Sequence, residues 1–342
     1  MKQYTSLYFV GAGGIGMSAL VRYFLAKGYK VAGYDRTQSP LTTELKTEGL
    51  EIVYEESVES IPDYCRNPET TLVVYTPAIP ASHAGLVYFR EHGFRVVKRA
   101  ELLGLITQSS KGLCFAGTHG KTTTSSMAAH IFHESPIGCN AFLGGILRNY
   151  NSNLILSEQS PFTVIEADEY DRSFHWLHPY MAVVTATDPD HLDIYGTEEA
   201  YLESFAHFTS LIQPGGCLIM KKGIKLVPSV KENVKIYTYS ARDGGDFHAG
   251  NIRIGDGTIV FDFVMPEGSV ADIELGVPVE INIENAVAAM AIAWLNGVSG
   301  NDMRRAMASF KGAKRRFEFW VRRPDRVMTV SYTHLRAHET TL

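Results

Sequence analysis

The sequence predicts an α/β protein built on parallel sheets, because apolar runs of strand length alternate with helical patterns. A first series of such runs occupies 7–10, 31–34, 71–75 and 95–97. A second series begins at 113–116 and continues at 162–165 and 182–185. Between about 234 and 283, shorter alternating runs separated by glycine-rich turns predict a small antiparallel β appendage.

The length of 342 residues predicts two or three domains. A polar stretch at 107–111 separates the two series of strands, so we place a boundary between 1–108 and 109–322 and treat 323–342 as a terminal stub. Hydrophobic residues make up 45% of the chain and charged residues 20%, as in a globular protein with a sizeable core. The net charge of -5 gives no reason to expect a nucleic-acid partner.

The cysteines and the hydropathy pattern predict a cytoplasmic protein. Cys65, Cys114, Cys139 and Cys217 are far apart and form no CxxC pair, so we expect reduced thiols rather than disulfides or metal ligands. No apolar run approaches the roughly 20 residues that a membrane span needs, and the glycine-rich N-terminus does not resemble a signal peptide. The sequence therefore indicates neither a membrane partner nor secretion.

A glycine loop lies between the strand at 113–116 and a predicted helix at 122–132. Backbone N–H groups of such a loop and the positive end of the helix dipole bind phosphate, so we expect ATP here. Lys121 would reach the β- and γ-phosphates, and the Thr122 hydroxyl would bind Mg²⁺. The usual first glycine is replaced by Phe115, and a chance glycine turn is the alternative. The candidate ATP-binding residues of the loop are Gly117, Thr118, His119, Gly120, Lys121, Thr122 and Thr123.

Two polar side chains follow the next strands of the second series. Glu166 ends the strand at 162–165, and the carboxyl ends of parallel strands are where ligands bind. A carboxylate there suits Mg²⁺, although a solvated acidic turn is the alternative. His191 follows the strand at 182–185 and is either a second metal ligand or a hydrogen-bonding partner of the phosphoryl group, with a structural histidine as the alternative.

The first domain contains a GxGxxG motif between a strand and a helix. Its glycines are Gly11, Gly13 and Gly16, and Asp35 ends the following strand, where a ribose hydroxyl would lie in a dinucleotide-binding protein. This spacing predicts a Rossmann-like domain. On its own it would favour an oxidoreductase, but that interpretation leaves the phosphate loop at 117–122 unexplained.

Taken in order, the motifs resemble those of the Mur ligases, the ATP-dependent enzymes of bacterial peptidoglycan synthesis. The segments are FVGAGGIGMSAL, GTHGKTTT, IEADEYDRSF, TATDPDHLDIYG and GAKRRFEF, and the resemblance extends from residue 1 to about 320. It is strongest to the members that join L-alanine to UDP-N-acetylmuramate through an acyl phosphate. Members that attach a recycled peptide to UDP-N-acetylmuramate are the alternative, and a scaffold protein without activity is a further one.

The resemblance assigns roles to individual residues. Lys121 would hold the ATP phosphates, Thr122 and Glu166 one Mg²⁺, and His191 a second metal. Arg315 or Arg316 would contact the γ-phosphate, while Asn282 and Asn285 would bind adenine, although Ile281 replaces the histidine usual in that motif. The residues implied for UDP-N-acetylmuramate are Gly11, Gly13, Gly14, Ile15, Gly16, Asp35, Thr76, Pro77, Ala78, Arg99, Gly144 and Gly145.

The family has a third, C-terminal domain that this chain does not match. Residues 331–342 show no strand period and no likeness to the family, so we expect a foreign tail in place of that domain. A natural two-domain variant is the alternative. Without the third domain, we expect the chain to bind its substrates but not to form the amide at a useful rate.

Overall fold

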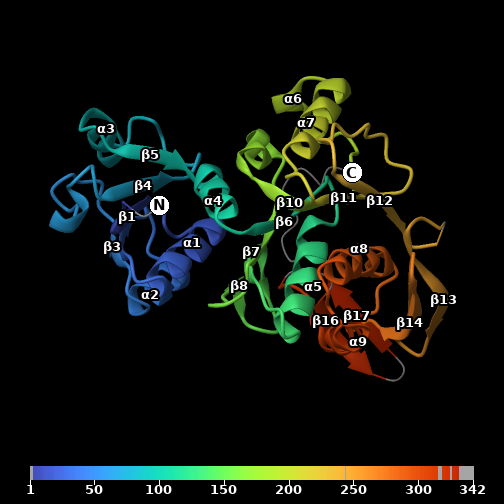
Figure 1. Cartoon of the computed structure of the whole chain (residues 1–342). Coiled ribbons are helices and arrows are strands. Elements are labelled where there is room, and N and C mark those ends of the chain that lie inside the picture. Colours follow the sequence, from blue (N-terminus) through green and yellow to red (C-terminus); the bar gives the residue numbers. More distant parts are fainter. Residues whose placement is uncertain (1–2, 243, 315–317, 324–325, 331–342) are drawn as a thin grey trace, which may run out of the picture. The chain divides into compact units, whose positions relative to one another are not determined.

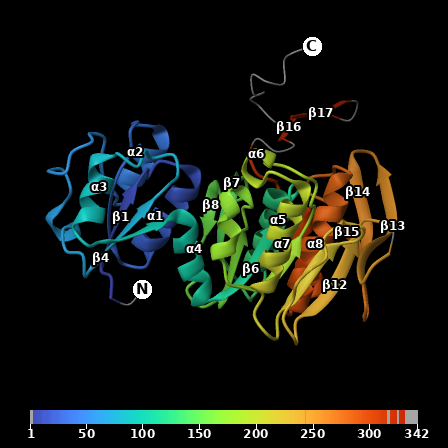
Figure 2. The same cartoon turned by 90° about the horizontal axis from the view of Figure 1, so that it is seen from above.

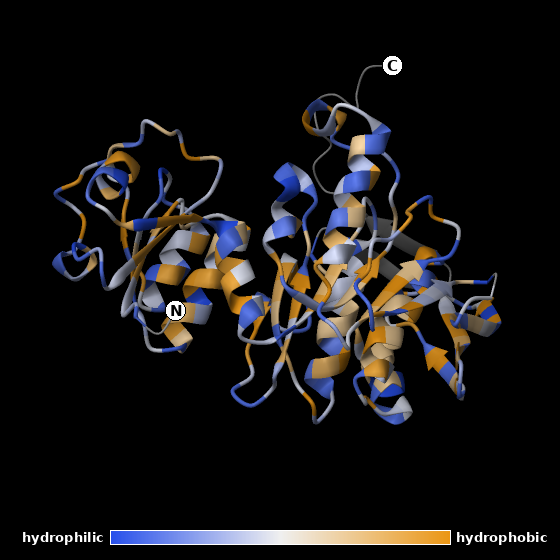
Figure 3. Ribbon diagram, turned by 45° about the horizontal axis from the view of Figure 1, so that its top comes forward, coloured by the Kyte–Doolittle hydropathy of each residue, from blue (hydrophilic) through white to orange (hydrophobic). Residues whose placement is uncertain are grey.

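The computed structural model describes residues 3–242, 244–314, 318–323 and 326–330. The chain forms two compact units that divide between Ser109 and Ser110 (Figure 1). In both units the strands are largely apolar, as the hydropathy colouring of Figure 3 shows. No helix in the described ranges has the length and hydropathy to cross a membrane.

The first unit contains a five-stranded parallel sheet in the order β3-β2-β1-β4-β5. Its strands are β1 Ser6–Val10, β2 Lys30–Tyr34, β3 Glu51–Val53, β4 Thr71–Tyr75 and β5 Arg95–Lys98. Its helices are α1 Ile15–Ala26, α2 Pro40–Thr47, α3 Ala84–Glu91 and α4 Arg99–Gln108, with a 3₁₀ turn, η1, at Asp63–Cys65. Strand β1 lies at the centre of the sheet and is buried along its whole length, as expected where helices cover a parallel sheet.

The second unit contains a ten-stranded sheet in the order β15-β14-β13-β12-β11-β10-β6-β9-β7-β8. The strands that lead to the candidate site are β6 Lys111–Ala116, β7 Asn140–Leu147, β8 Ser152–Ile155, β9 Phe162–Glu166 and β10 Pro179–Val184. The others are β11 Cys217–Lys221, β12 Lys235–Ser240, β13 Phe247–Gly255, β14 Thr258–Met265 and β15 Gly268–Glu274. Because β6 lies between β9 and β10, with both parallel to it, the segments after all three strands emerge at the same edge.

The expected α/β class is confirmed, including the antiparallel addition. The antiparallel pairing is β13 with β14 and β14 with β15, whereas β12 pairs in parallel with β11 and with β13. The antiparallel part is therefore shorter than the sequence indicated. Strands β16 Glu318–Arg323 and β17 Arg326–Val330 form a separate hairpin. The expectation of a foreign tail at 331–342 concerns residues outside the described ranges.

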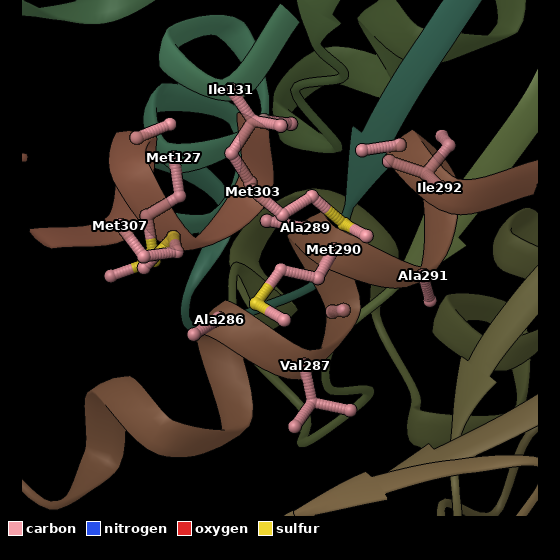
Figure 4. Close-up of a cluster of buried hydrophobic side chains, with 14 of the residues drawn as sticks. Met127, Ile131, Ala286, Val287, Ala289, Met290, Ala291, Ile292, Met303 and Met307 are labelled. Atoms are coloured by element: carbon pink, nitrogen blue, oxygen red, sulfur yellow. The ribbon is translucent and has the colours of Figure 1, made fainter. Parts of the chain in front are cut away.

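The helices of the second unit are α5 Lys121–Glu134, α6 Leu192–Tyr195, α7 Glu198–Ser210, α8 Ile281–Leu295 and α9 Gly300–Ser309, with a 3₁₀ segment, η2, at Tyr170–Trp176. Helices α5 and α8 lie side by side, as Figures 1 and 2 show from two directions. Met127, Met290 and Met303, one from each of α5, α8 and α9, meet in a buried cluster (Figure 4). Truncating Met290 to alanine would lower the free energy of unfolding by about 2–5 kcal/mol, because the close-packed helices fill the cavity left by the side chain only in part. This packing fixes the direction of α5, whose N-terminus belongs to the candidate site.

Candidate active site

The phosphate loop connects β6 to α5 through two glycines with left-handed backbone. Gly117 has φ 137° and Gly120, the N-cap of α5, has φ 86°. A side chain at Gly117 would lie 2.7 Å from the Ala186 nitrogen, and Thr118 N–H donates to the Ala186 carbonyl at 3.1 Å. The loop is therefore pressed against the segment after β10. The first turn of α5 carries no acidic residue, so its N–H groups are well suited to an anion.

Lys121 folds back over the loop that it follows. Its ammonium donates to the Gly117 carbonyl at 2.7 Å and lies 2.7 Å from both carboxylate oxygens of Glu169. The Glu169 side chain is only 2% exposed. Sequence reasoning gave Glu169 no role and missed this contact, because it joins residues 48 positions apart in the sequence.

Thr122, Glu166 and Gly144 come together at the start of α5. The Thr122 hydroxyl donates to Glu166 Oε1 at 2.9 Å, and the Gly144 N–H donates to Glu166 Oε2 at 3.0 Å. A side chain at Gly144 would collide with the Glu166 carboxylate, and one at Gly145 would touch the side chains of Thr122 and Ala313. Burial raises the pKa of Glu166, whereas the Thr122 hydrogen bond and the Lys121 charge oppose that rise.

The oxygen atoms gathered here fit Mg²⁺. The Thr122 hydroxyl and the Glu166 carboxylate are adjacent hard oxygen donors, and Mg²⁺ commonly takes few protein ligands beside substrate phosphates and water. Within the described ranges no group of three or more His, Cys, Asp and Glu is placed to hold a metal. A magnesium ion at Thr122 and Glu166 would accordingly complete its coordination with phosphate and water oxygens.

His191 lies at the start of α6 rather than in the hydrogen-bonded group of Thr122, Glu166 and Gly144. It caps α6 with a left-handed backbone, φ 53°, and its Nε2 is 3.8 Å from Asp190 Oδ2. Its ring contacts the ring of Tyr170 with centroids 5.2 Å apart. Glu166 hydrogen-bonds to Thr122 and Gly144 instead, so the structure does not join His191 to the Glu166 cluster, and its role as a metal ligand stays a prediction.

The segment that carries His191 is anchored to the phosphate loop by the predicted residue Thr118 and by Thr185 and Tyr201, which sequence reasoning missed. The Thr118 hydroxyl bonds to the Asp188 carbonyl at 2.7 Å and to the Tyr201 hydroxyl at 2.9 Å. The Thr185 hydroxyl donates to the His119 carbonyl. No motif marks Thr185 or Tyr201, and their partners in the loop are 66 and 83 residues away in the sequence. Thr123 lies half-exposed in the first turn of α5.

The two asparagines of α8 form a buried chain of hydrogen bonds. Asn282 Nδ2 donates to the Val277 carbonyl at 3.1 Å, and Asn285 Nδ2 donates to Asn282 Oδ1 at 3.1 Å. The Thr124 hydroxyl of α5 donates to Asn285 Oδ1 at 3.2 Å. These amides therefore join α8 to α5 in this structure, and base recognition by them stays a prediction.

A hollow of about 360 Å³ opens at the N-terminus of α8. It is lined by Ala241, Arg242, Glu280, Ile281, Ile283 and Glu284. Ile281 is 51% exposed at this position, where the sequence pattern expects a histidine. Arg242 and Glu280 pair across the hollow. The predicted γ-phosphate contacts, Arg315 and Arg316, lie outside the described residues.

In the first unit, the glycine loop is held by the side chain of Asp35. Its carboxylate accepts the Gly13 N–H at 2.7 Å and the Thr37 N–H at 3.1 Å. A side chain at Gly13 would lie 2.8 Å from Asp35 Oδ2. The loop therefore takes part of the hydrogen-bonding capacity of the Asp35 carboxylate, whose oxygens keep further lone pairs for a ligand hydroxyl.

Other predicted residues gather around the same loop. A side chain at Gly16 would lie 2.8 Å from the Arg99 guanidinium, and one at Gly11 would lie 2.6 Å from Thr76 Cγ2. Gly14 caps α1, and Ile15, its first residue, is 44% exposed. Pro77 and Ala78 form an exposed turn after β4. The first unit therefore brings a cation, a helix N-terminus and a glycine loop together, which suits a diphosphate.

Comparisons with known proteins cover both units. The family description "Mur ligase family, catalytic domain" matches residues 6–111, and "Mur ligase middle domain" matches residues 115–293. A UDP-N-acetylmuramate–L-alanine ligase of Parabacteroides distasonis is 64% identical over 334 residues, which are 98% of this chain and 72% of that protein. One of the same name from Flavobacterium psychrophilum is 46% identical over 98% of this chain and 72% of that protein.

Two solved structures share the fold. The crystal structure of UDP-N-acetylmuramate-alanine ligase from Thermotoga maritima has a TM-score of 0.79 at 24% identity, covering 96% of this chain and 74% of that one. The UDP-N-acetylmuramate:L-alanyl-gamma-D-glutamyl-meso-diaminopimelate ligase from Neisseria meningitides has a TM-score of 0.78 at 22% identity, covering 91% of this chain and 99% of that one. At these identities the likeness is one of fold.

Proposed function

Because the chain belongs to the Mur ligase family, we propose that it is an ATP-dependent ligase that joins L-alanine to the lactyl carboxylate of UDP-N-acetylmuramate. Relatives that carry this name are 64% and 46% identical to it, each over 98% of the chain. The likeness to the meso-diaminopimelate peptide ligase, at 22% identity, is a likeness of fold and does not favour the peptide-recycling alternative.

The observation that carries the proposal is the meeting of the phosphate loop with Glu166. The Thr122 hydroxyl lies 2.9 Å from the Glu166 carboxylate, directly at the N-terminus of α5. A dinucleotide-dependent oxidoreductase has no use for this arrangement.

A carboxylate is a poor electrophile, so the ligase first converts it to an acyl phosphate. A carboxylate oxygen of UDP-N-acetylmuramate attacks the γ-phosphorus of ATP, and the bond to the bridging oxygen breaks to release ADP. The α5 N-terminus and Lys121 stabilise the negative charge on the phosphates during this transfer. Mg²⁺ held by Thr122 and Glu166 supplies further charge neutralisation when bound.

The amine of L-alanine then attacks the carbonyl carbon of the acyl phosphate. The tetrahedral intermediate expels phosphate, the amine loses a proton, and the amide remains. We assign His191 to this region as a candidate second metal ligand, supported by its place after β10 beside the phosphate loop. Gly144 and Gly145 are proposed to face the muramoyl group, because they are adjacent to Glu166 and Thr122.

The hollow at the N-terminus of α8 is the proposed adenine site. Ile281 offers an apolar surface for the base, and the motif that contains Asn282 and Asn285 lies at its edge. Arg315 or Arg316 is proposed to contact the γ-phosphate. The glycine loop of the first unit, with Arg99 and Thr76, is proposed to hold the UDP moiety. These substrates and the four buried free thiols suit a place in the bacterial cytoplasm.

Thermal unfolding in the presence of ligands tests the proposal. We expect ATP with Mg²⁺ and UDP-N-acetylmuramate each to raise the Tm of the protein, because each binds only the folded state. The Glu166→Gln variant should lose most of the Mg²⁺-dependent part of the ATP effect. A rise in Tm with NAD together with indifference to ATP would contradict the ligase assignment and favour the oxidoreductase.

A further inference from the structure

Glu169 is a buried carboxylate to which the reaction described above gives no part. The Lys121 ammonium lies 2.7 Å from each of its oxygens, and the two side chains are 14% and 2% exposed. That ammonium also donates a hydrogen bond to the Gly117 carbonyl. The ammonium therefore already uses donors that phosphate oxygens would take.

The Glu169 carboxylate depends on Lys121. Lys121 donates to Oε1, whereas Oε2 has no hydrogen bond of good geometry. Burial raises the pKa of Glu169, and the Lys121 charge opposes that rise. Withdrawing the ammonium would leave a buried charge without its cationic partner, which is strongly unfavourable.

The backbone of Glu169 is fixed beside the loop. The Tyr195 hydroxyl of α6 donates to the Glu169 carbonyl at 2.5 Å, and the Arg172 N–H donates to the same oxygen at 3.0 Å. Neighbouring Asp171 and Arg172 have left-handed backbone, φ 50° and 52°, which packing must hold in place. The carboxylate cannot simply follow the lysine when the lysine moves toward a ligand.

We propose that Glu169 is a positioning residue that competes with the nucleotide phosphates for Lys121 and thereby sets the affinity of the phosphate loop for ATP. The inference rests on the proposed ATP site. While Lys121 is held by Glu169, only the small fraction of molecules with a free ammonium binds phosphate at full strength. The apparent affinity is reduced by that fraction.

The test is a calorimetric titration of the wild-type protein and the Glu169→Gln variant with three probes: ATP with Mg²⁺, inorganic tripolyphosphate and adenosine. In the variant we expect the Kd of ATP and of tripolyphosphate to fall roughly three- to tenfold, because the competing charge is gone. The Kd of adenosine should not change, because the competition acts at the phosphates. Glu203→Gln, the same change on an exposed face of α7, is the matched control and should bind all three probes like the wild type.

A folded Glu169→Gln protein that binds tripolyphosphate equally or more weakly would overturn the inference, since a merely structural glutamate would give that result. If the Glu169→Gln protein does not fold, Glu169→Asp replaces it, because the shorter side chain withdraws the carboxylate from Lys121 and should also tighten phosphate binding. ATP binding by the wild type with no change in either variant would contradict the competition but not the proposed function. If neither the wild type nor the variant binds ATP or tripolyphosphate, the competition and the proposed function are both wrong.

Discussion

His130 should make the stability of the second unit fall in mild acid. It lies in α5 and is 1% exposed, with Nδ1 2.6 Å from the Tyr150 hydroxyl and Nε2 2.9 Å from the Ser309 hydroxyl. The Tyr150 hydroxyl donates to Glu134 at 3.0 Å and therefore accepts from Nδ1–H. Burial lowers the pKa of His130 from 6.5 to about 4, so the ring is neutral in the folded protein.

The sign and size of the effect follow from that pKa. A histidine whose pKa is lower in the folded state stabilises the fold fully above the unfolded-state pKa of 6.5 and progressively less as the pH falls toward about 4. The shift corresponds to roughly 3 kcal/mol in total, at about 1.36 kcal/mol per pKa unit, and about 2 kcal/mol of it is lost by pH 5. A His130→Gln variant has no such proton to take up. Its free energy of unfolding relative to that of wild type should therefore rise by about 2 kcal/mol from pH 7.5 to 5.

Urea unfolding followed by tryptophan fluorescence measures this difference. All three tryptophans, Trp176, Trp294 and Trp320, belong to the second unit, so the signal reports that unit alone. His207→Gln, which removes an exposed histidine from the same unit, is the control and should run parallel to wild type. Parallel curves for wild type and His130→Gln between pH 7.5 and 5 would refute the reasoning.

Three further predictions concern the loop, the asparagine chain and the thiols. Gly117→Ala should abolish ATP binding in calorimetry and lower the free energy of unfolding by about 1–3 kcal/mol. The reason is that the alanine side chain would collide with Thr185 and Ala186, and that the backbone φ of 137° is strained for alanine. ATP binding like that of wild type would contradict this. Asn285→Ala should destabilise the second unit by about 1–3 kcal/mol in the same urea assay, because it leaves the Thr124 hydroxyl and the Asn282 amide oxygen without partners; an unchanged midpoint would show that these bonds are dispensable. The four cysteines are buried and free, and burial raises their pKa values. A thiol reagent should therefore react with them only after unfolding. Fast reaction of any thiol in the native protein would contradict their burial.

The elements that the sequence predicts well are those with local causes. The strand before the phosphate loop, the glycines at its bends and the helix after it follow from an apolar run, from glycine's freedom at positive φ and from a period of 3.6 residues. The place of Glu166 follows from the rule that strand ends share one edge of a parallel sheet. Strand direction has no such local signal, which is why β12 was expected in an antiparallel group and pairs in parallel with β11.

What the sequence does not reveal depends on distant packing. Glu169 belongs to an acidic run that is typical of a solvated turn, yet it lies buried against Lys121, 48 residues away in the sequence. Asn282 and Asn285 fit a base-binding motif, yet an asparagine that binds a ligand and one that joins two helices look alike in sequence. Asp35 likewise has the spacing of a ribose-binding acid, although its carboxylate holds the glycine loop.

Calorimetric titration with ATP and Mg²⁺, comparing wild type with Lys121→Ala, tests the central claim most directly. The account predicts saturable binding of one ATP per chain to wild type and a large loss of affinity when the phosphate-loop ammonium is removed. UDP-N-acetylmuramate should bind both proteins equally if its UDP moiety is held by the first unit. Binding of NAD in place of ATP, or ATP binding that is indifferent to Lys121, would contradict the assignment of the loop at 117–122 as the ATP site of a ligase.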